Sequence, residues 1–187
     1  MPASDRSSWG GNVGTADGSD FEGGIGNWSN GTQAVSAAQS TEQAHKGTNS
    51  LKIVRNATAS GYLAVTATDF PIAASTTYYF QCWMYSNAAA GVVKFDCDFY
   101  QSNNSTYISS IQPVIPNTTL TQDGWTQLGP VQFTSPALAA YIRPIPVSVS
   151  GLANGNVLYL DDIFVGRLLV PKGQLVMPQS INRASSR

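Results

Sequence analysis

The stretch TYYFQCWMYS, residues 77–86, carries the clearest structural pattern in the chain. Its side chains alternate between two kinds, which is the period of two residues expected of a β-strand. One set is apolar and suited to a protein core: Tyr78, Phe80, Cys82 and Met84. The other set is aromatic and polar at once: Tyr79, Gln81, Trp83 and Tyr85. The stretch therefore predicts a long strand of an antiparallel sheet with one face on the core.

The next stretch, VVKFDCDFYQ at residues 92–101, divides in the same way. Val93, Phe95, Cys97 and Phe99 form its apolar set, and Lys94, Asp96, Asp98 and Tyr100 form its polar set. A turn at residues 87–91 would pair the two strands as a hairpin. This pairing predicts one continuous outer surface and sets Cys82 beside Cys97, either as a disulfide or as two buried thiols.

The outer surface of this predicted hairpin is the best candidate binding site in the sequence. Aromatic rings stack on the apolar faces of sugar rings, while carboxylates and amides bind the hydroxyl groups around them, as in the stacking of bases on aromatic side chains. The alternative is that Trp83 and Tyr85 are covered by other parts of the molecule and serve as packing. The predicted carbohydrate-binding residues are Trp83, Tyr85, Gln81, Tyr79, Asp96, Asp98 and Tyr100.

Strand patterns separated by turn residues continue over most of the chain and predict an all-β antiparallel sandwich. We expect strands near residues 33–38, 50–56, 61–68, 77–86, 92–101, 106–112, 125–133, 139–149 and 156–165, with a short helical turn as the alternative within residues 36–45. Residues 1–20 are rich in Gly and Ser and predict an extended N-terminal arm.

The C-terminal residues 166–187 contain basic side chains and no acidic one. The simple interpretation is a solvated tail, and the alternative is a C-terminal arm that docks on an acidic partner surface. The candidate docking residues are Arg167, Lys172, Arg183 and Arg187. The predicted organisation is thus an arm over residues 1–20, a sandwich over 21–165 and a basic arm over 166–187.

The composition excludes several classes of function. Charged residues make up 11% of the 187-residue chain and the net charge is −1, so no basic surface for nucleic acid is expected. The single histidine, His45, excludes most histidine-dependent catalysis and any site with several histidine ligands. Asp96 and Asp98 resemble a glycosidase acid and base only in their spacing, and Lys94 would keep both ionised. We therefore expect a protein that is not an enzyme.

Three ordered segments resemble the jelly-roll carbohydrate-binding modules of the xylan- and glucan-binding group, which share a galactose-binding-like sandwich. The first is Asp20-Phe21-Glu22 followed by Trp28, and the second is GTNSL at residues 47–51 together with the strand that begins at Thr77. The third is YLDDI at residues 159–163. The resemblance spans residues 20–165 and implies a jelly-roll domain that binds sugar without catalysis.

The resemblance also implies one structural calcium ion. In that group an opening Glu and a closing Asp meet backbone carbonyl groups around the ion, and the matching positions here are Glu22, Asp161 and the Lys46 carbonyl. Calcium prefers six to eight such oxygen ligands. The alternative is that Asp161 and Asp162 cap loops or pair with Lys46.

No secretory signal is recognisable at the start of the sequence, whereas a sugar-binding domain acts outside the cell. A bacteriophage virion protein, released by lysis, would reconcile the two. The main hypothesis from sequence is therefore a capsid decoration protein on the virion surface, bound through its arms to the major capsid protein or other virion subunits and forming a homo-oligomer. The alternatives are an extracellular carbohydrate-binding module of a polysaccharide-degrading enzyme, or a phage tail or receptor-binding protein.

Overall fold

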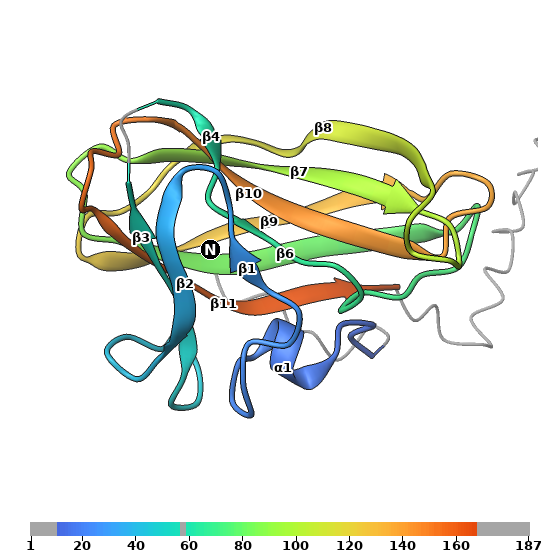
Figure 1. Cartoon of the computed structure of the whole chain (residues 1–187), viewed down its shortest axis with the longest axis horizontal. Helices are drawn as coiled ribbons and strands as arrows, with labels where there is room; N and C mark the ends of the chain where they lie inside the picture. The colour runs from blue at the N-terminus through green and yellow to red at the C-terminus, as the bar shows by residue number, and fades with distance from the viewer. Residues whose placement is uncertain (1–10, 57–58, 168–187) are drawn as a thin grey trace, which may run out of the picture.

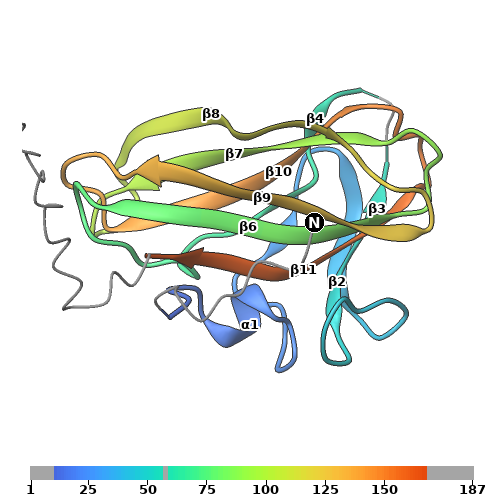
Figure 2. The same ribbon diagram turned by 180° about the vertical axis from the view of Figure 1, so that it is seen from behind.

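Two antiparallel sheets packed face to face form the body of the molecule (Figure 1). The computed structural model describes residues 11–56 and 59–167. The four-stranded sheet has the order β4-β10-β7-β8, with bounds Gly61–Tyr62, Tyr141–Ser150, Val92–Tyr100 and Tyr107–Thr119. The five-stranded sheet has the order β2-β3-β11-β6-β9, with bounds Ala34–Ser40, Ser50–Arg55, Val157–Gly166, Thr77–Ser86 and Gly124–Thr134. Figure 2 shows β9, β6 and β11 side by side from behind.

The predicted all-β jelly-roll sandwich is confirmed, and so are most of the predicted strands. The predicted strand at residues 61–68 is instead split into β4 and β5 (Ala64–Val65), and β5 pairs with β1 (Ser29–Asn30). The alternative helical turn within residues 36–45 does not form, because β2 and a loop occupy that segment. Among the described residues, α1 (Ala16–Ser19) is the single helix, and no helix there has the length and apolar character needed to cross a membrane.

The core between the sheets contains the two apolar faces that the sequence predicts. The inward side chains of β6 are at most 1% exposed, and so are those of β7. Phe80 of β6 and Phe95 of β7 meet edge to face across the core, with ring centroids 5.3 Å apart. Such contacts between aromatic rings add to the hydrophobic stabilisation of the sandwich.

The predicted hairpin of β6 and β7 is wrong. β6 pairs with β11 and β9, whereas β7 pairs with β10 and β8, so the two strands lie in opposite sheets. Residues 87–91 carry the chain from one layer to the other. Cys82 and Cys97 accordingly face the core from opposite sheets, and both are free thiols.

The described part of the predicted N-terminal arm packs onto the sandwich. The Val13 N–H donates to the Val165 carbonyl at 2.8 Å, and Trp28 Nε1 donates to the Gly18 carbonyl at 2.8 Å. The Thr15 side chain accepts from the Gly18 N–H and caps α1. Residues 11–20 therefore belong to the folded domain and do not extend from it, while residues 1–10 lie outside the described residues.

Candidate functional site

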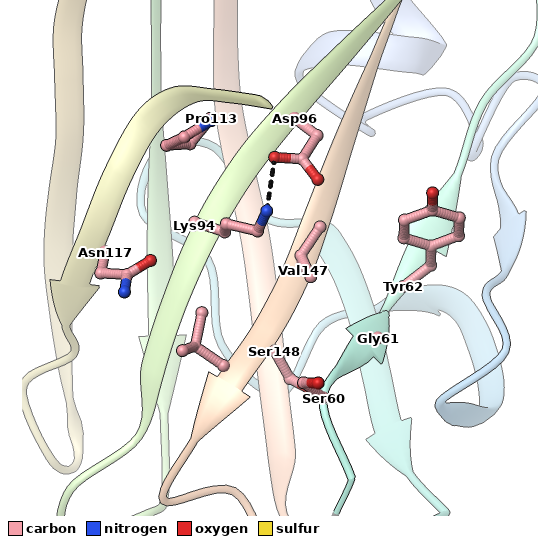
Figure 3. Close-up of a pocket in the computed structure, with 10 residues that line it drawn as sticks. Ser60, Gly61, Tyr62, Lys94, Asp96, Pro113, Asn117, Val147 and Ser148 are labelled. Atoms are coloured by element: carbon pink, nitrogen blue, oxygen red, sulfur yellow. Dashed lines mark ion pairs between the residues drawn. The ribbon is translucent and has the colours of Figure 1, made fainter. Parts of the chain in front are cut away.

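Two adjoining hollows lie on the outer face of the four-stranded sheet, and Tyr62 lines both of them. We call the two hollows together the groove. The first, of about 440 Å³, is shown in Figure 3 and is lined by Ser60, Gly61, Tyr62, Lys94, Asp96, Pro113, Asn117, Val147, Ser148 and Val149. The second, of about 320 Å³, is lined by Asn27, Ser29, Tyr62, Val65, Thr66, Ala67, Asp98, Tyr100, Arg143 and Ile145.

Tyr62 forms the wall that the two hollows share. It lies on the two-residue edge strand β4, which pairs with β10 at Val147 and Ser148. It is 38% exposed, and among the described aromatic residues only Tyr107, at 51%, is more exposed. A tyrosine in this setting offers a flat apolar face and a hydroxyl group to a ligand.

An ion pair lies in the first hollow, where Lys94 Nζ and Asp96 Oδ1 are 3.0 Å apart (Figure 3). Both side chains come from β7, and Asp96 is 3% exposed. The Lys94 ammonium is thus the charged partner of the buried Asp96 carboxylate. A ligand hydroxyl placed here would meet a charged donor and a charged acceptor side by side.

An arginine stacked on a tyrosine forms one side of the second hollow. The Arg143 guanidinium carbon lies 3.7 Å from the centroid of the Tyr100 ring, which is a close cation–π contact. Arg143 Nε donates to the Ala67 carbonyl at 3.2 Å, and its Nη2 donates to the Asn104 carbonyl at 2.6 Å. These bonds hold the guanidinium in place between two loops.

The remaining carboxylate of the groove is Asp98, which pairs with Arg143 in the register of β7 and β10. Burial raises the pKa of Asp98, the charge of Asp96 raises it further, and Arg143 opposes both effects. The groove thus combines one exposed aromatic ring with carboxylates, an ammonium and a guanidinium. This is the mixture of stacking surface and hydrogen-bonding groups that suits a polyhydroxylated ligand.

The outer face of the five-stranded sheet carries more aromatic rings, but they contact one another. His45 stacks on Trp83 with centroids 3.9 Å apart and planes 14° apart. Trp125 meets His45 at 5.5 Å and Tyr85 at 5.9 Å, edge to face in both cases. We call His45, Trp83, Tyr85 and Trp125 the aromatic cluster. His45 occupies a stacking position on Trp83 that a sugar ring would need.

The loop that carries His45 is fixed to β11. The carboxylate of Asp161 accepts the N–H groups of His45 at 2.8 Å and Lys46 at 3.1 Å, and Asp162 Oδ2 lies 2.7 Å from His45 Nδ1. Burial raises the pKa of Asp161 to about 6, while these N–H groups act in the opposite direction. The hydrogen bonds account for the position of His45 over Trp83.

The predicted calcium ligands are only partly brought together. Glu22 and the Lys46 residue line a cavity of about 220 Å³ with Asp20, Gly47 and Asp162, but Asp161 does not line it. Among the described residues, no three His, Cys, Asp or Glu side chains come together as a metal site.

Hydrogen-bond donors surround the carboxylate of Glu22, one of the predicted calcium ligands. Glu22 Oε1 accepts the N–H groups of Thr48 and Asn49, each at 2.9 Å, and the Thr48 hydroxyl donates to Oε2 at 2.8 Å. These bonds lower the pKa of Glu22 to about 2. In this arrangement the Glu22 carboxylate does not fit a calcium ligand, because its oxygens already accept these hydrogen bonds, and a calcium ion would require those donors to move.

The other predicted site residues lie on opposite faces of the sandwich. Asp96, Asp98 and Tyr100 line the groove. Gln81 is 1% exposed and lies within hydrogen-bond distance of Gln127, while the Tyr79 hydroxyl donates to Gln132 at 3.1 Å. The prediction that these residues share one continuous outer surface is therefore wrong, because β6 and β7 belong to different sheets.

Of the predicted docking residues, only Arg167 is described. Its guanidinium lies over the Tyr78 ring, 5.4 Å from the centroid, and Nη2 donates to the Tyr78 hydroxyl at 3.4 Å. Lys172, Arg183 and Arg187 lie outside the described residues. Docking through this arm stays a prediction.

Two residues of the groove were missed at the level of sequence. Arg143 lies within a predicted strand, and the alternation of Tyr141, Arg143, Ile145 and Val147 was a usable signal for an outward face. Tyr62 had no such signal, since it follows a glycine in a segment whose strands are only two residues long.

No family model matches the sequence, and no curated protein matches it. Solved structures do match its fold.

One match is the CBM22-1 and GH10 two-module structure of an endo-1,4-β-D-xylanase from Clostridium thermocellum, complexed with xylohexaose. It has a TM-score of 0.63 and 16% identity over 80% of this chain, which spans 28% of the longer protein. A xylan-binding domain of CBM 22 matches with a TM-score of 0.59 and 17% identity, covering 88% of this chain and 98% of the domain.

A third match is a family 16 carbohydrate-binding module, with a TM-score of 0.52 and 20% identity over 82% of this chain and 99% of the module. At these identities the likeness concerns the fold. The chain has the jelly-roll sandwich that carbohydrate-binding modules also have.

Proposed function

We propose that this chain is a non-catalytic carbohydrate-binding module that holds an extended polysaccharide in the groove of its four-stranded sheet. The observation that carries the proposal is Tyr62, an exposed ring between two hollows lined by Asp96, Asp98 and Arg143. Together these groups supply stacking and hydrogen bonding in one open depression.

The dimensions and charges of the groove favour a chain of neutral sugars. Its polar residues on β7 run from Lys94 to Tyr100, and the six residue steps between them span about 20 Å in an extended strand, enough for several sugar rings. The charges of Lys94 and Arg143 balance those of Asp96 and Asp98. A neutral ligand therefore meets hydrogen-bonding groups without a net field of one sign.

The matching structures supply the first ligand to test. Two of them are xylanase modules, one complexed with xylohexaose and the other named a xylan-binding domain. A β-1,4-linked xylan is therefore the first polysaccharide class we propose. Such a ligand implies an extracellular location, which stays a prediction.

Titration of the full chain with xylohexaose tests this function. Replacing Tyr62 by Ala should weaken binding about tenfold or more, because loss of one stacked ring costs about 1–3 kcal/mol in comparable aromatic platforms. Tyr79→Ala is the matched control, since Tyr79 lies on the opposite sheet.

Two results would contradict the proposal. One is the absence of binding to xylohexaose, cello-oligosaccharides and other neutral glycans alike. The other is equal loss of affinity in the Tyr62 and Tyr79 variants, because the groove would then have no special role.

The comparisons offer nothing in favour of the virion hypothesis, since the matches reported above are carbohydrate-binding modules or contain one. The roles as capsid decoration protein or phage tail protein, with capsid partners and oligomerisation, stay predictions. The proposed binding function does not depend on them.

A further inference from the structure

Arg55, at the end of β3, is a fully buried cation. Its side chain is 1% exposed, and none of its hydrogen bonds with described residues goes to a carboxylate. Burial of a charge without an opposite charge is expensive, so its hydrogen bonds must offset much of that cost. A guanidinium in this position can hold neutral acceptors from several segments together.

The four acceptors of Arg55 come from three segments of the chain. Nη1 donates to Ser148 Oγ on β10 at 2.8 Å and reaches the Gln33 carbonyl before β2 at 3.4 Å. Nη2 donates to the Ala59 carbonyl after β3 at 2.9 Å and to the Leu152 carbonyl after β10 at 3.2 Å. The planar fork of a guanidinium is suited to this task.

Two of these acceptors adjoin the groove. Ser148 lines the first hollow, and Ala59 directly precedes the wall formed by Ser60, Gly61 and Tyr62. Ser148 Oγ also donates to the Ala59 carbonyl at 3.3 Å. Arg55, Ser148 of β10 and Ala59 before the wall are thus joined to one another by hydrogen bonds.

Backbone hydrogen bonds also hold the wall, because the Gln33 N–H donates to the Tyr62 carbonyl at 2.9 Å. β4 is two residues long and lies at the edge of its sheet, paired only with β10 among the described strands. Gly61 approaches Gln33 so closely that a Cβ atom there would lie 2.5 Å from Gln33 Cγ. Gln33, whose carbonyl accepts from Arg55 and whose N–H donates to Tyr62, is therefore a second link between Arg55 and the wall.

We propose that Arg55 is a positioning residue for the groove, which fixes the Ser60–Tyr62 wall against β10 without touching the ligand. The inference rests on the proposed function where it concerns glycan affinity. Its structural part, the fixation of the wall, is measurable without any ligand.

Arg55→Met and Arg55→Lys test the proposal in the full chain. Both variants should bind xylohexaose about tenfold more weakly, because a disordered wall lowers the fraction of molecules ready to bind. Lysine keeps the charge, but its single nitrogen cannot reach all four acceptors. Amide exchange at Leu63, whose N–H donates to the Pro146 carbonyl at 2.8 Å, should also accelerate about tenfold.

Two controls separate positioning from general stability. Lys52→Met removes a cation of the same strand that pairs with Glu42 elsewhere, and Ile53→Ala removes a buried core side chain of that strand. Below the melting temperatures, both controls should keep xylohexaose affinity within about twofold of the native chain.

Native affinity and native Leu63 exchange in a folded Arg55 variant would overturn the proposal. If Arg55→Met fails to fold, Arg55→Lys decides alone. If the native chain itself does not bind xylohexaose, the proposed function fails, and Leu63 exchange still decides whether Arg55 fixes the wall.

Discussion

The two outer faces of the sandwich carry similar side chains in opposite arrangements. On the four-stranded sheet, Tyr62 is 38% exposed between two hollows, and polar groups face the open space. On the five-stranded sheet, the ring of Trp83 is covered by His45 at 3.9 Å. The five-stranded sheet has more aromatic rings on its outer face, yet Tyr62 on the four-stranded sheet has a ring that a ligand can reach.

This difference shows that aromatic content alone does not identify a binding face. A ring contributes to binding a sugar only where one of its faces is free, whereas a ring stacked on a neighbour contributes to stability. The hydrogen bonds from Asp161 to the backbone of His45 and Lys46 place that loop over Trp83. We therefore assign the groove to binding and the aromatic cluster to packing.

The largest expected effect concerns stability and comes from Trp83→Ala. Loss of a tryptophan in contact with His45 should lower the free energy of unfolding by about 3 kcal/mol, toward the low end for such truncations because Trp83 is only partly buried. Affinity for xylohexaose should stay within about twofold at temperatures where the variant is folded. Chemical denaturation and calorimetric titration measure the two quantities, and a stable variant without affinity would reverse our assignment of the faces.

A smaller effect is expected from Arg143→Lys in the groove. Lysine keeps the charge but loses the planar contact with Tyr100 and one of the loop hydrogen bonds, so xylohexaose affinity should fall about tenfold. The matched control is Arg167→Lys, because Arg167 also lies over a tyrosine, Tyr78, but follows β11 of the other sheet. Equal affinities of the two variants would argue against a role of Arg143 in the groove.

A still smaller effect concerns Glu22 and acid stability. Hydrogen bonds from Asn49 and Thr48 lower the pKa of Glu22 from 4.5 to about 2. A lowered pKa stabilises the fold at pH values above 4.5, and this contribution is lost as the pH falls toward 2. The melting temperature of the native chain should therefore decrease over this interval more steeply than that of Glu22→Gln. If the two melting temperatures fall in parallel with pH, the hydrogen bonds of Glu22 do not contribute to acid stability in this way.

The smallest expected effect is that of calcium. Since N–H groups and a hydroxyl already occupy the carboxylate of Glu22, calcium and a chelator should give the same melting temperature. A stabilisation by several degrees that saturates with calcium would support the predicted ion and show that Glu22 exchanges its donors for the metal.

The sequence was sufficient to predict strands and their inner and outer faces. Alternation in residues 77–86 identified Phe80, Cys82 and Met84 as core residues, because a strand that covers a core must repeat every two residues. The same alternation says nothing about which strand lies alongside. β6 is therefore a correctly predicted strand with wrongly predicted neighbours, since its partners β11 and β9 are distant in sequence.

The groove was harder to predict for the same physical reason. Asp96, Asp98 and Tyr100 were recognised on one strand, but their neighbours Arg143 and Tyr62 come from β10 and β4. The exposure of Tyr62 and the stacking of His45 on Trp83 are consequences of tertiary packing. No local pattern in the sequence contains that information.

Assignment of binding to the groove is tested most directly by following the backbone amide resonances of the full chain during titration with xylohexaose. We predict that the largest shifts cluster on β4, β7 and β10, around Tyr62, Asp98 and Arg143. Shifts centred instead on Trp83, Tyr85 and Trp125 of the five-stranded sheet would contradict the account.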